Sequence, residues 1–313
     1  MTTHFIEIAQ RAAADGQIAA DELMALRREG WGDGIITRAE AEALFALNTS
    51  LKERSPEWCD FFVEAIGEFV LNGTPPRLQC SDEEAQWLIG QIDHDGVLES
   101  MVELETLVRI IERAENTPDR LKDYVLAQVE REVLTGVGPT CCGGELSATH
   151  ISAAECRIIR RVIFASGGHG PAAVTRHDAE MLFRLKDETL AEENAAEWDD
   201  LFVDGVANFL KGFVLDHAQV SHDRKRELEA FVADNSASVG RFMGRVAKEA
   251  PQVMNHFGKV FGKKKPGTDY TAKAAAGEAI TDYENDWLEG MIDADGEVDE
   301  LESRLIARLA AEA

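Results

Sequence analysis

The sequence predicts an all-α protein made of two tandem, diverged helical units, the second of which carries an inserted basic helical segment. Three observations predict this architecture. Apolar residues such as Leu44, Leu47 and Leu51 recur with the period of a helix that buries one face, and no segment shows the alternation expected of a strand. Three sequence blocks occur twice in the same order. A stretch rich in glycine lies between the two sets of blocks.

The repeated blocks indicate an internal duplication, because three matches in one order require more than a shared composition. The matching blocks are 36–47 and 174–185, 58–64 and 198–204, and 87–96 and 287–296. The spacing between matching residues grows from 138 to 140 and then to 200. The second unit therefore contains an insertion between its second and third blocks.

The unit boundaries follow from these blocks. Residues 135–144 hold four glycines and a proline, which do not sustain a helix. We therefore expect a first unit at 1–137 and a second unit at 145–313, with the insertion at about 213–275. The paired tryptophans, Trp58 with Trp198 and Trp87 with Trp287, can either line a ligand site or fill the two cores, and we favour the cores.

Charge and composition restrict the class of protein. The chain has 58 acidic and 32 basic residues and a formal charge of -26, which argues against nucleic acid as a partner and favours cations or a protein partner with a basic surface. The same charge can also serve solubility alone. We expect no secretory signal, no transmembrane segment and, with five cysteines in no disulfide-like pattern, a cytoplasmic protein.

Short Asp-Gly loops carry the candidate chemistry. An EF-hand loop holds calcium with oxygens at positions one, three, five, nine and twelve and has glycine at six. With Gly296 at six, positions three, five, nine and twelve are Asp293, Asp295, Asp299 and Glu302, while Met291 stands at one. With Gly96 at six, positions three, five and nine are Asp93, Asp95 and Glu99, while Val102 stands at twelve. These residues are our candidate ligands for calcium or magnesium.

Helix capping offers a second interpretation of the same residues. Position nine is also the expected N-cap of the next helix, and a carboxylate three residues later completes a capping box without metal. Asp299 with Glu302 fits this pattern, as do Thr37 with Glu40, Ser152 with Glu155 and Thr175 with Asp178. Capping does not require Asp293 or Asp295, so both interpretations stay open for that loop.

The loop at 294–302, followed by an amphipathic helix, resembles the loops of bacterial EF-hand proteins and the acidic Asp-Gly loops of TerB-type tellurite-resistance domains. Either resemblance implies pairs of helices and an acidic cation site, carried here by Asp293, Asp295, Asp299 and Glu302.

The insertion contains an unusual basic segment. Residues 236–266 have seven lysines and arginines and a single acidic residue, Glu249. Such an amphipathic segment can pack on its own unit, or it can bind an acidic face of this protein or of a partner. It can also bind peripherally to the surface of an anionic membrane.

Enzymatic motifs give little support for catalysis. The sequence has no nucleophile elbow, no phosphate-binding Gly-Lys-Ser/Thr loop and no His-Glu-x-x-His helix. The spacing of Cys141, Cys142, His150 and Cys156 does not match zinc knuckles. We therefore predict a non-enzymatic adaptor or regulatory protein that responds to a divalent cation. The alternative is an enzyme that depends on a metal or a small ligand.

Overall fold

The computed structural model describes residues 2–30, 35–93, 98, 100–141, 150–165, 174–211, 282–292 and 298–312. These residues form α-helices and one short 3-10 helix, and within them there is no strand, which confirms the all-α prediction. The helices are α1 (Thr2–Asp15), α2 (Ala20–Gly30), α3 (Arg38–Ser50), α4 (Pro56–Asn72), α5 (Asp82–Ile92), α6 (Met101–Arg113), α7 (Asp119–Thr135), η1 (Pro139–Cys141), α8 (Ala153–Ile163), α9 (Arg176–Thr189), α10 (Ala196–Leu210), α14 (Asp282–Ile292) and α15 (Glu300–Glu312).

Side chains at the helix starts fix where the helices begin. Complete capping boxes precede α3, α5, α8 and α9, so the capping interpretation is confirmed for the three pairs at Thr37, Ser152 and Thr175. Ser55 caps α4, whose first residue is Pro56, where the missing N–H costs no hydrogen bond. At the other end of α7, Gly136 has a φ of 68°, a left-handed conformation that stops the helix.

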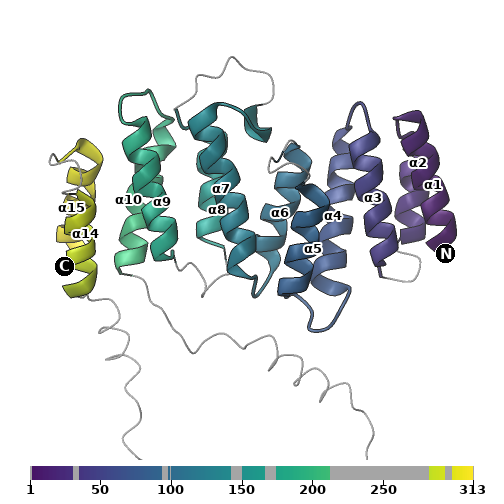
Figure 1. Cartoon of the computed structure of the whole chain (residues 1–313), viewed down its shortest axis with the longest axis horizontal. Coiled ribbons are helices and arrows are strands. Elements are labelled where there is room, and N and C mark those ends of the chain that lie inside the picture. The colour runs from purple at the N-terminus through teal and green to yellow at the C-terminus, as the bar shows by residue number, and fades with distance from the viewer. Residues whose placement is uncertain are drawn as a thin grey trace, which may run out of the picture.

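The helices stand side by side in a row that follows the order of the chain. Figure 1 shows α1 and α2 at one end of the long axis and α14 and α15 at the other. In the first half, α1 packs on α2 and α3, α4 packs on α2 and α3, and α6 packs on α4. In the second half, α7 packs on α8 and α9, α10 packs on α8 and α9, and α15 packs on α10. The helices of the two halves correspond in order: α2 to α8, α3 to α9, α4 to α10, α5 to α14 and α6 to α15. Residues at the same distance from the first residue of corresponding helices are called counterparts below.

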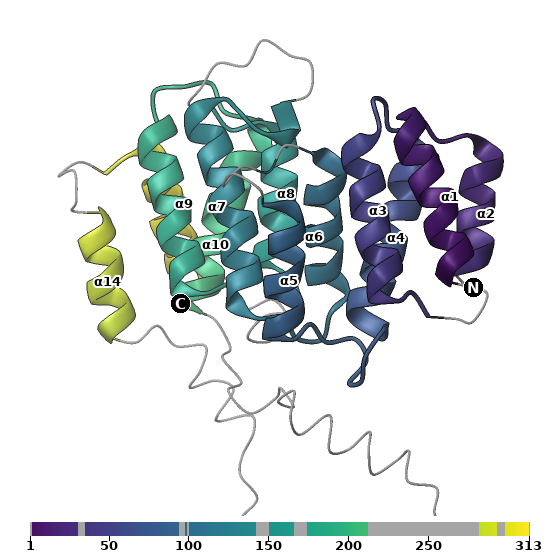
Figure 2. The same ribbon diagram turned by 45° about the vertical axis from the view of Figure 1, so that its right-hand side comes forward.

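The two halves meet through helices rather than through a linker. Helix α7 lies against α5 and α6 as well as against α8 and α9, and α6 also contacts α8. Figure 2 shows α7 between α9 on one side and α8 and α6 on the other. The buried apolar residues of both halves belong to one continuous core. The predicted boundary at 137–145 follows α7, so α7 belongs to the predicted first unit although it packs on α8 and α9 and is described here with the second half. Whether each unit folds alone stays a prediction.

Three of the four paired tryptophans, Trp58, Trp198 and Trp287, are buried in the core, as predicted, whereas Trp87 is half-buried. Trp58 and Trp198 have no exposed surface. Trp87 and its counterpart Trp287 each meet a phenylalanine edge-on, which is a favourable geometry for aromatic rings. The ring pairs are Phe45–Trp87 and Phe183–Trp287, with centroids 5.9 and 5.8 Å apart.

Two further predictions concern membranes and the insertion. None of the helices in the described ranges is long and apolar enough to cross a bilayer. The insertion at about 213–275, including the basic segment 236–266, lies outside the described residues.

Candidate functional site: the buried carboxylates at helix starts

The start of α15 brings together two of the predicted ligands. The backbone N–H of Asp299 donates to Oε2 of Glu302 at 3.1 Å, and the N–H of Glu302 donates to Oδ1 of Asp299 at 2.9 Å. These reciprocal bonds are those of a capping box. Glu302 is 1% exposed, so its charge needs a partner inside the protein.

Lys186 of α9 supplies that partner. Its Nζ donates to Oδ2 of Asp299 at 2.6 Å, to Oε1 of Glu302 at 2.7 Å and to Oδ1 of Asp187 at 2.8 Å. Lys186 is itself 1% exposed. Burial lowers the pKa of Lys186, but the hydrogen bonds to Asp187, Asp299 and Glu302 outweigh it and hold the pKa above its usual range. Three carboxylates thus surround one ammonium group. Two of them, Asp299 and Glu302, lie 113 and 116 residues away from Lys186 in the chain.

The other predicted ligands are described only in part. Asp293, Asp295, Asp95 and Glu99 lie outside the described residues. Asp93 is described and follows the last turn of α5, where its N–H donates to the carbonyl of Ile89 at 2.7 Å. Among the side chains that the structure does describe, no group of three metal-ligating residues is arranged around a vacant point. Calcium or magnesium binding at these loops therefore stays a prediction.

In the first half, an asparagine stands at the position of Lys186. Asn48, the counterpart of Lys186, is fully buried and donates from Nδ2 to Oε1 of Glu103 at 2.9 Å. Its Oδ1 accepts from Nε1 of Trp58 at 3.1 Å and from Nε of Arg54 at 3.0 Å. Trp198, the counterpart of Trp58, has a buried Nε1 with no hydrogen-bond partner in the described part of the chain. A lysine cannot accept a hydrogen bond, which explains the difference.

The alignment of Gly96 with position six of an EF-hand loop did not identify Glu103 as a residue of this site. That alignment placed Val102 at position twelve, but α6 begins at Met101 and Glu103 is its third residue, as Glu302 is in α15. The first-half loop is therefore one residue longer between its glycine and the helix. The spacing of Ser100 and Glu103 is a capping pattern that could have identified this carboxylate, although the Ser100 side chain makes no capping bond.

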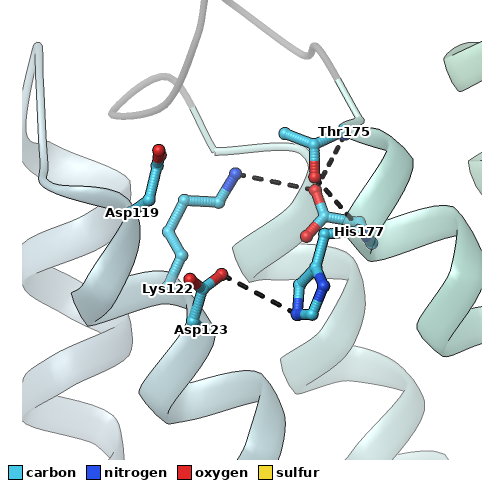
Figure 3. Close-up of a pocket in the computed structure, with 6 residues that line it drawn as sticks. Asp119, Lys122, Asp123, Thr175 and His177 are labelled. Atoms are coloured by element: carbon cyan, nitrogen blue, oxygen red, sulfur yellow. Dashed lines mark hydrogen bonds and ion pairs between the residues drawn. The ribbon is translucent and has the colours of Figure 1, made fainter.

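A second buried lysine meets a capping carboxylate between α7 and α9. Nζ of Lys122 lies 3.7 Å from Oδ2 of Asp178, and Figure 3 shows the Lys122 side chain extending from α7 toward the start of α9. The two side chains are 4% and 2% exposed and border a cavity of about 180 Å³. Beside them, Nε2 of His177 lies 4.0 Å from Oδ1 of Asp123, whose pKa is raised by burial despite the histidine. In the second half, one buried lysine therefore pairs with the capping carboxylate at the start of α9, and another pairs with those at the start of α15.

The cysteine and histidine grouping gains little from the structure. Of its four members, only His150 and Cys156 have described side chains. Cys156 is 2% exposed, and burial raises the pKa of its thiol to about 12. A thiol in this state is a poor nucleophile and a poor metal ligand at neutral pH.

The first half also has a large groove, with a volume of about 920 Å³. It is formed by the start of α3, the end of α4, the connection 73–81 and the start of α5. Its apolar lining is Ile35, Ile36, Phe69, Pro75, Pro76, Trp87 and Pro118, and its charged lining is Arg38, Asp82, Glu83 and Glu84.

Comparisons with protein-family models, with curated proteins and with solved structures found no match to this chain.

Proposed function

We propose that this protein is a non-enzymatic adaptor built from two copies of one helical unit. Its first half holds a basic, partly apolar peptide segment of a protein partner in the groove between α3 and α5. The observation that carries this proposal is the composition of that groove, which combines an apolar floor with an acidic rim.

The floor is preorganised for an apolar side chain. Trp87 is held edge-on between Phe45 and Phe69, with ring centroids 5.9 and 4.9 Å away. Ile35 is 48% exposed at the groove although it is a large apolar residue. A groove floor that is already rigid loses little conformational entropy when a ligand binds, so more of the free energy of the contacts appears as affinity.

The charged residues at the rim of the groove favour a positively charged ligand. Three carboxylates line the groove, at Asp82, Glu83 and Glu84, against one guanidinium group at Arg38. Arg38 already pairs with Glu42 at 3.0 Å and lies 5.4 Å from the centre of the Trp87 ring. The groove therefore has a surplus of negative charge in a chain of charge -26. Both the local and the overall field favour a basic segment and speed its encounter with the groove.

The duplication is supported by matching detail in the two halves. Most helix pairs that pack together in the first half have a corresponding pair in the second, such as α3 on α4 with α9 on α10, and α4 on α6 with α10 on α15. The ring pairs Phe45–Phe62 and Phe183–Phe202 both have centroids 5.1 Å apart.

A hard divalent cation is the proposed regulator of the second half. Three carboxylates share Lys186, so the start of α15 has more negative charge than the lysine neutralises. A cation held by Asp293 and Asp295 would compete with Lys186 for Asp299 and Glu302. Oxygen ligands of this kind suit calcium or magnesium.

A fluorescent peptide of lysine and phenylalanine tests the groove by anisotropy. We expect saturable binding that weakens with salt and is lost when glutamate replaces lysine or serine replaces phenylalanine. Ile35→Ser and Glu83→Lys change exposed groove residues and should each weaken binding about tenfold, roughly 1.4 kcal/mol.

Matched controls make the same chemical changes elsewhere. Met24→Ser removes an apolar side chain that is 73% exposed on α2, and Glu53→Lys reverses an exposed charge outside the groove. Neither should alter binding. Equal losses in groove and control variants would show non-specific attraction to an acidic surface and would overturn the proposal.

A further inference from the structure

The insertion contains a short segment with the chemistry proposed above for the ligand of the groove. Residues 257–265 hold two phenylalanines, Phe257 and Phe261, and four lysines. In the sequence, no acidic residue stands between Glu249 and Asp269. This composition combines apolar anchors with positive charge, as the floor and the rim of the groove require. The chain therefore carries a candidate ligand for its own groove.

We propose that residues 257–265 occupy the groove between α3 and α5 of the same chain, and that the peptide of a protein partner binds by displacing them. This inference rests on the proposed function, because it concerns the same groove and names the ligand that the groove holds before a partner arrives. A phenylalanine of the segment would lie on the floor beside Trp87, and the lysines would lie at the rim.

Glu83 is the rim carboxylate that a lysine of the segment would meet. Asp82 already lies 3.6 Å from Arg120, and Glu84 completes the capping box of α5. Glu83 is exposed and forms no ion pair with another residue of the described ranges. Exposed ion pairs contribute little to stability, so the aromatic floor should supply most of the affinity and Glu83 the preference for a basic segment.

Two differences favour this groove over the corresponding place in the second half, which is nearer to the segment in the chain. Trp87 is half-buried at the groove, whereas its counterpart Trp287 is 8% exposed. Tyr283 stands in the sequence where the first half has Glu83. The second half therefore offers less exposed indole surface and lacks this carboxylate.

The chain is long enough for the segment to reach the groove from both of its ends. Contacts from α10 to α9, α7 and α5 make three steps, and packed helices lie roughly 8–10 Å apart, so the distance across the row is about 30 Å. Helix α14 meets α9 at the ring pair Phe183–Trp287 and is separated from α5 by the same steps. The shorter connection, the 17 residues from Lys265 to Asp282, spans at most about 56 Å when extended. Its length permits binding within one molecule.

Anisotropy with the full chain and the fluorescent lysine and phenylalanine peptide as probe tests the inference. Phe257→Ser with Phe261→Ser removes the anchors of the segment, and Lys263→Gln with Lys264→Gln and Lys265→Gln removes its charges. Each set should tighten binding of the probe about tenfold. A tethered segment has an effective concentration of about 1 mM, so one that binds at about 0.1 mM lowers the affinity of the probe by roughly that factor.

Matched controls make the same changes elsewhere in the insertion. Phe231→Ser, and Arg224→Gln with Lys225→Gln and Arg226→Gln, should leave the affinity of the probe as it is. Equal affinity in the wild type and in the segment variants would overturn this inference and leave the proposed function of the groove intact. A probe that binds none of these proteins would overturn both. A gain that appears only at high protein concentration would place the segment in the groove of a second copy and overturn binding within one chain.

Discussion

Asn48 and Lys186 occupy counterpart positions on α3 and α9, yet Asn48 donates to a single carboxylate and Lys186 donates to three. The change from amide to ammonium accompanies a second change, because Asp299 stands where the first half has Ser100. The added carboxylate and the added cation compensate each other. Trp198 loses a hydrogen bond as a result. Its indole N–H has no acceptor in the described part of the chain, whereas that of Trp58 donates to Oδ1 of Asn48.

Replacing Lys186 by asparagine should therefore destabilise the protein. The variant gains an acceptor for Trp198 but leaves Glu302 buried without a cation, and removing one partner of a buried ion pair costs about 3–5 kcal/mol. Urea unfolding followed by circular dichroism measures the loss. Adding Glu302→Gln to Lys186→Asn should restore part of the stability, because the buried side chain at position 302 then carries no charge that needs a cation. An unchanged unfolding midpoint in the single variant would contradict the role given to Lys186.

Calcium binding and capping demand different residues of the loop before α15. Changing Asp293 and Asp295 together to asparagine keeps the capping pair Asp299 and Glu302. We expect calcium to raise the melting temperature of the wild type and to have no effect on this double variant, whose metal-free stability should hold. A wild type that shows no heat and no shift at millimolar calcium would reject the metal site and leave capping as the sole role of the loop.

Glu155 should make stability depend on pH. Burial raises the pKa of its carboxyl above the usual value, against the lowering effect of the Ser152 hydrogen bonds. A carboxyl with a raised folded pKa is harder to ionise in the folded than in the unfolded state, so ionised Glu155 costs stability as pH rises through the folded pKa. Glutamine keeps the capping box and carries no charge. Glu155→Gln should therefore melt higher than the wild type at pH 7 and equally at about pH 3, below the unfolded pKa of about 4.3.

The control for this comparison is Glu83→Gln, which makes the same change at an exposed glutamate. A Glu155→Gln variant that melts lower than the wild type at pH 7 would show that the charge itself stabilises the cap.

Arg161 should be important for joining the two halves. Its guanidinium group lies 2.6 and 2.8 Å from the carboxylate oxygens of Glu105 and 2.8 and 2.7 Å from those of Glu112. Lysine cannot form two such bidentate pairs, so Arg161→Lys should cost about 1 kcal/mol, a value reduced because the site is partly exposed. Arg28→Lys changes the counterpart and should be neutral in the same urea titration. Equal midpoints for both variants would show that the pairing contributes nothing.

The sequence predicted the features that depend on neighbouring residues. Helical periodicity gave the all-α class, and the spacing of Thr37 and Glu40 gave a capping box. It could not predict features that depend on distant segments. Nothing in the α9 pattern shows that Lys186 turns inward, because its partners are 113 and 116 residues away. Glu103 was missed for a different reason, since one extra loop residue shifts it from the expected position.

Because α7 packs on helices of both halves, the halves are joined by side-chain packing and not by an extended linker. The peptide groove near Trp87 and the lysine cluster at the start of α15 therefore belong to helices that share one core. A cation that draws Asp299 and Glu302 away from Lys186 would loosen a helix of the same packed body that holds the groove. The affinity of the groove for its peptide would then report on an event at the far end of the row of helices.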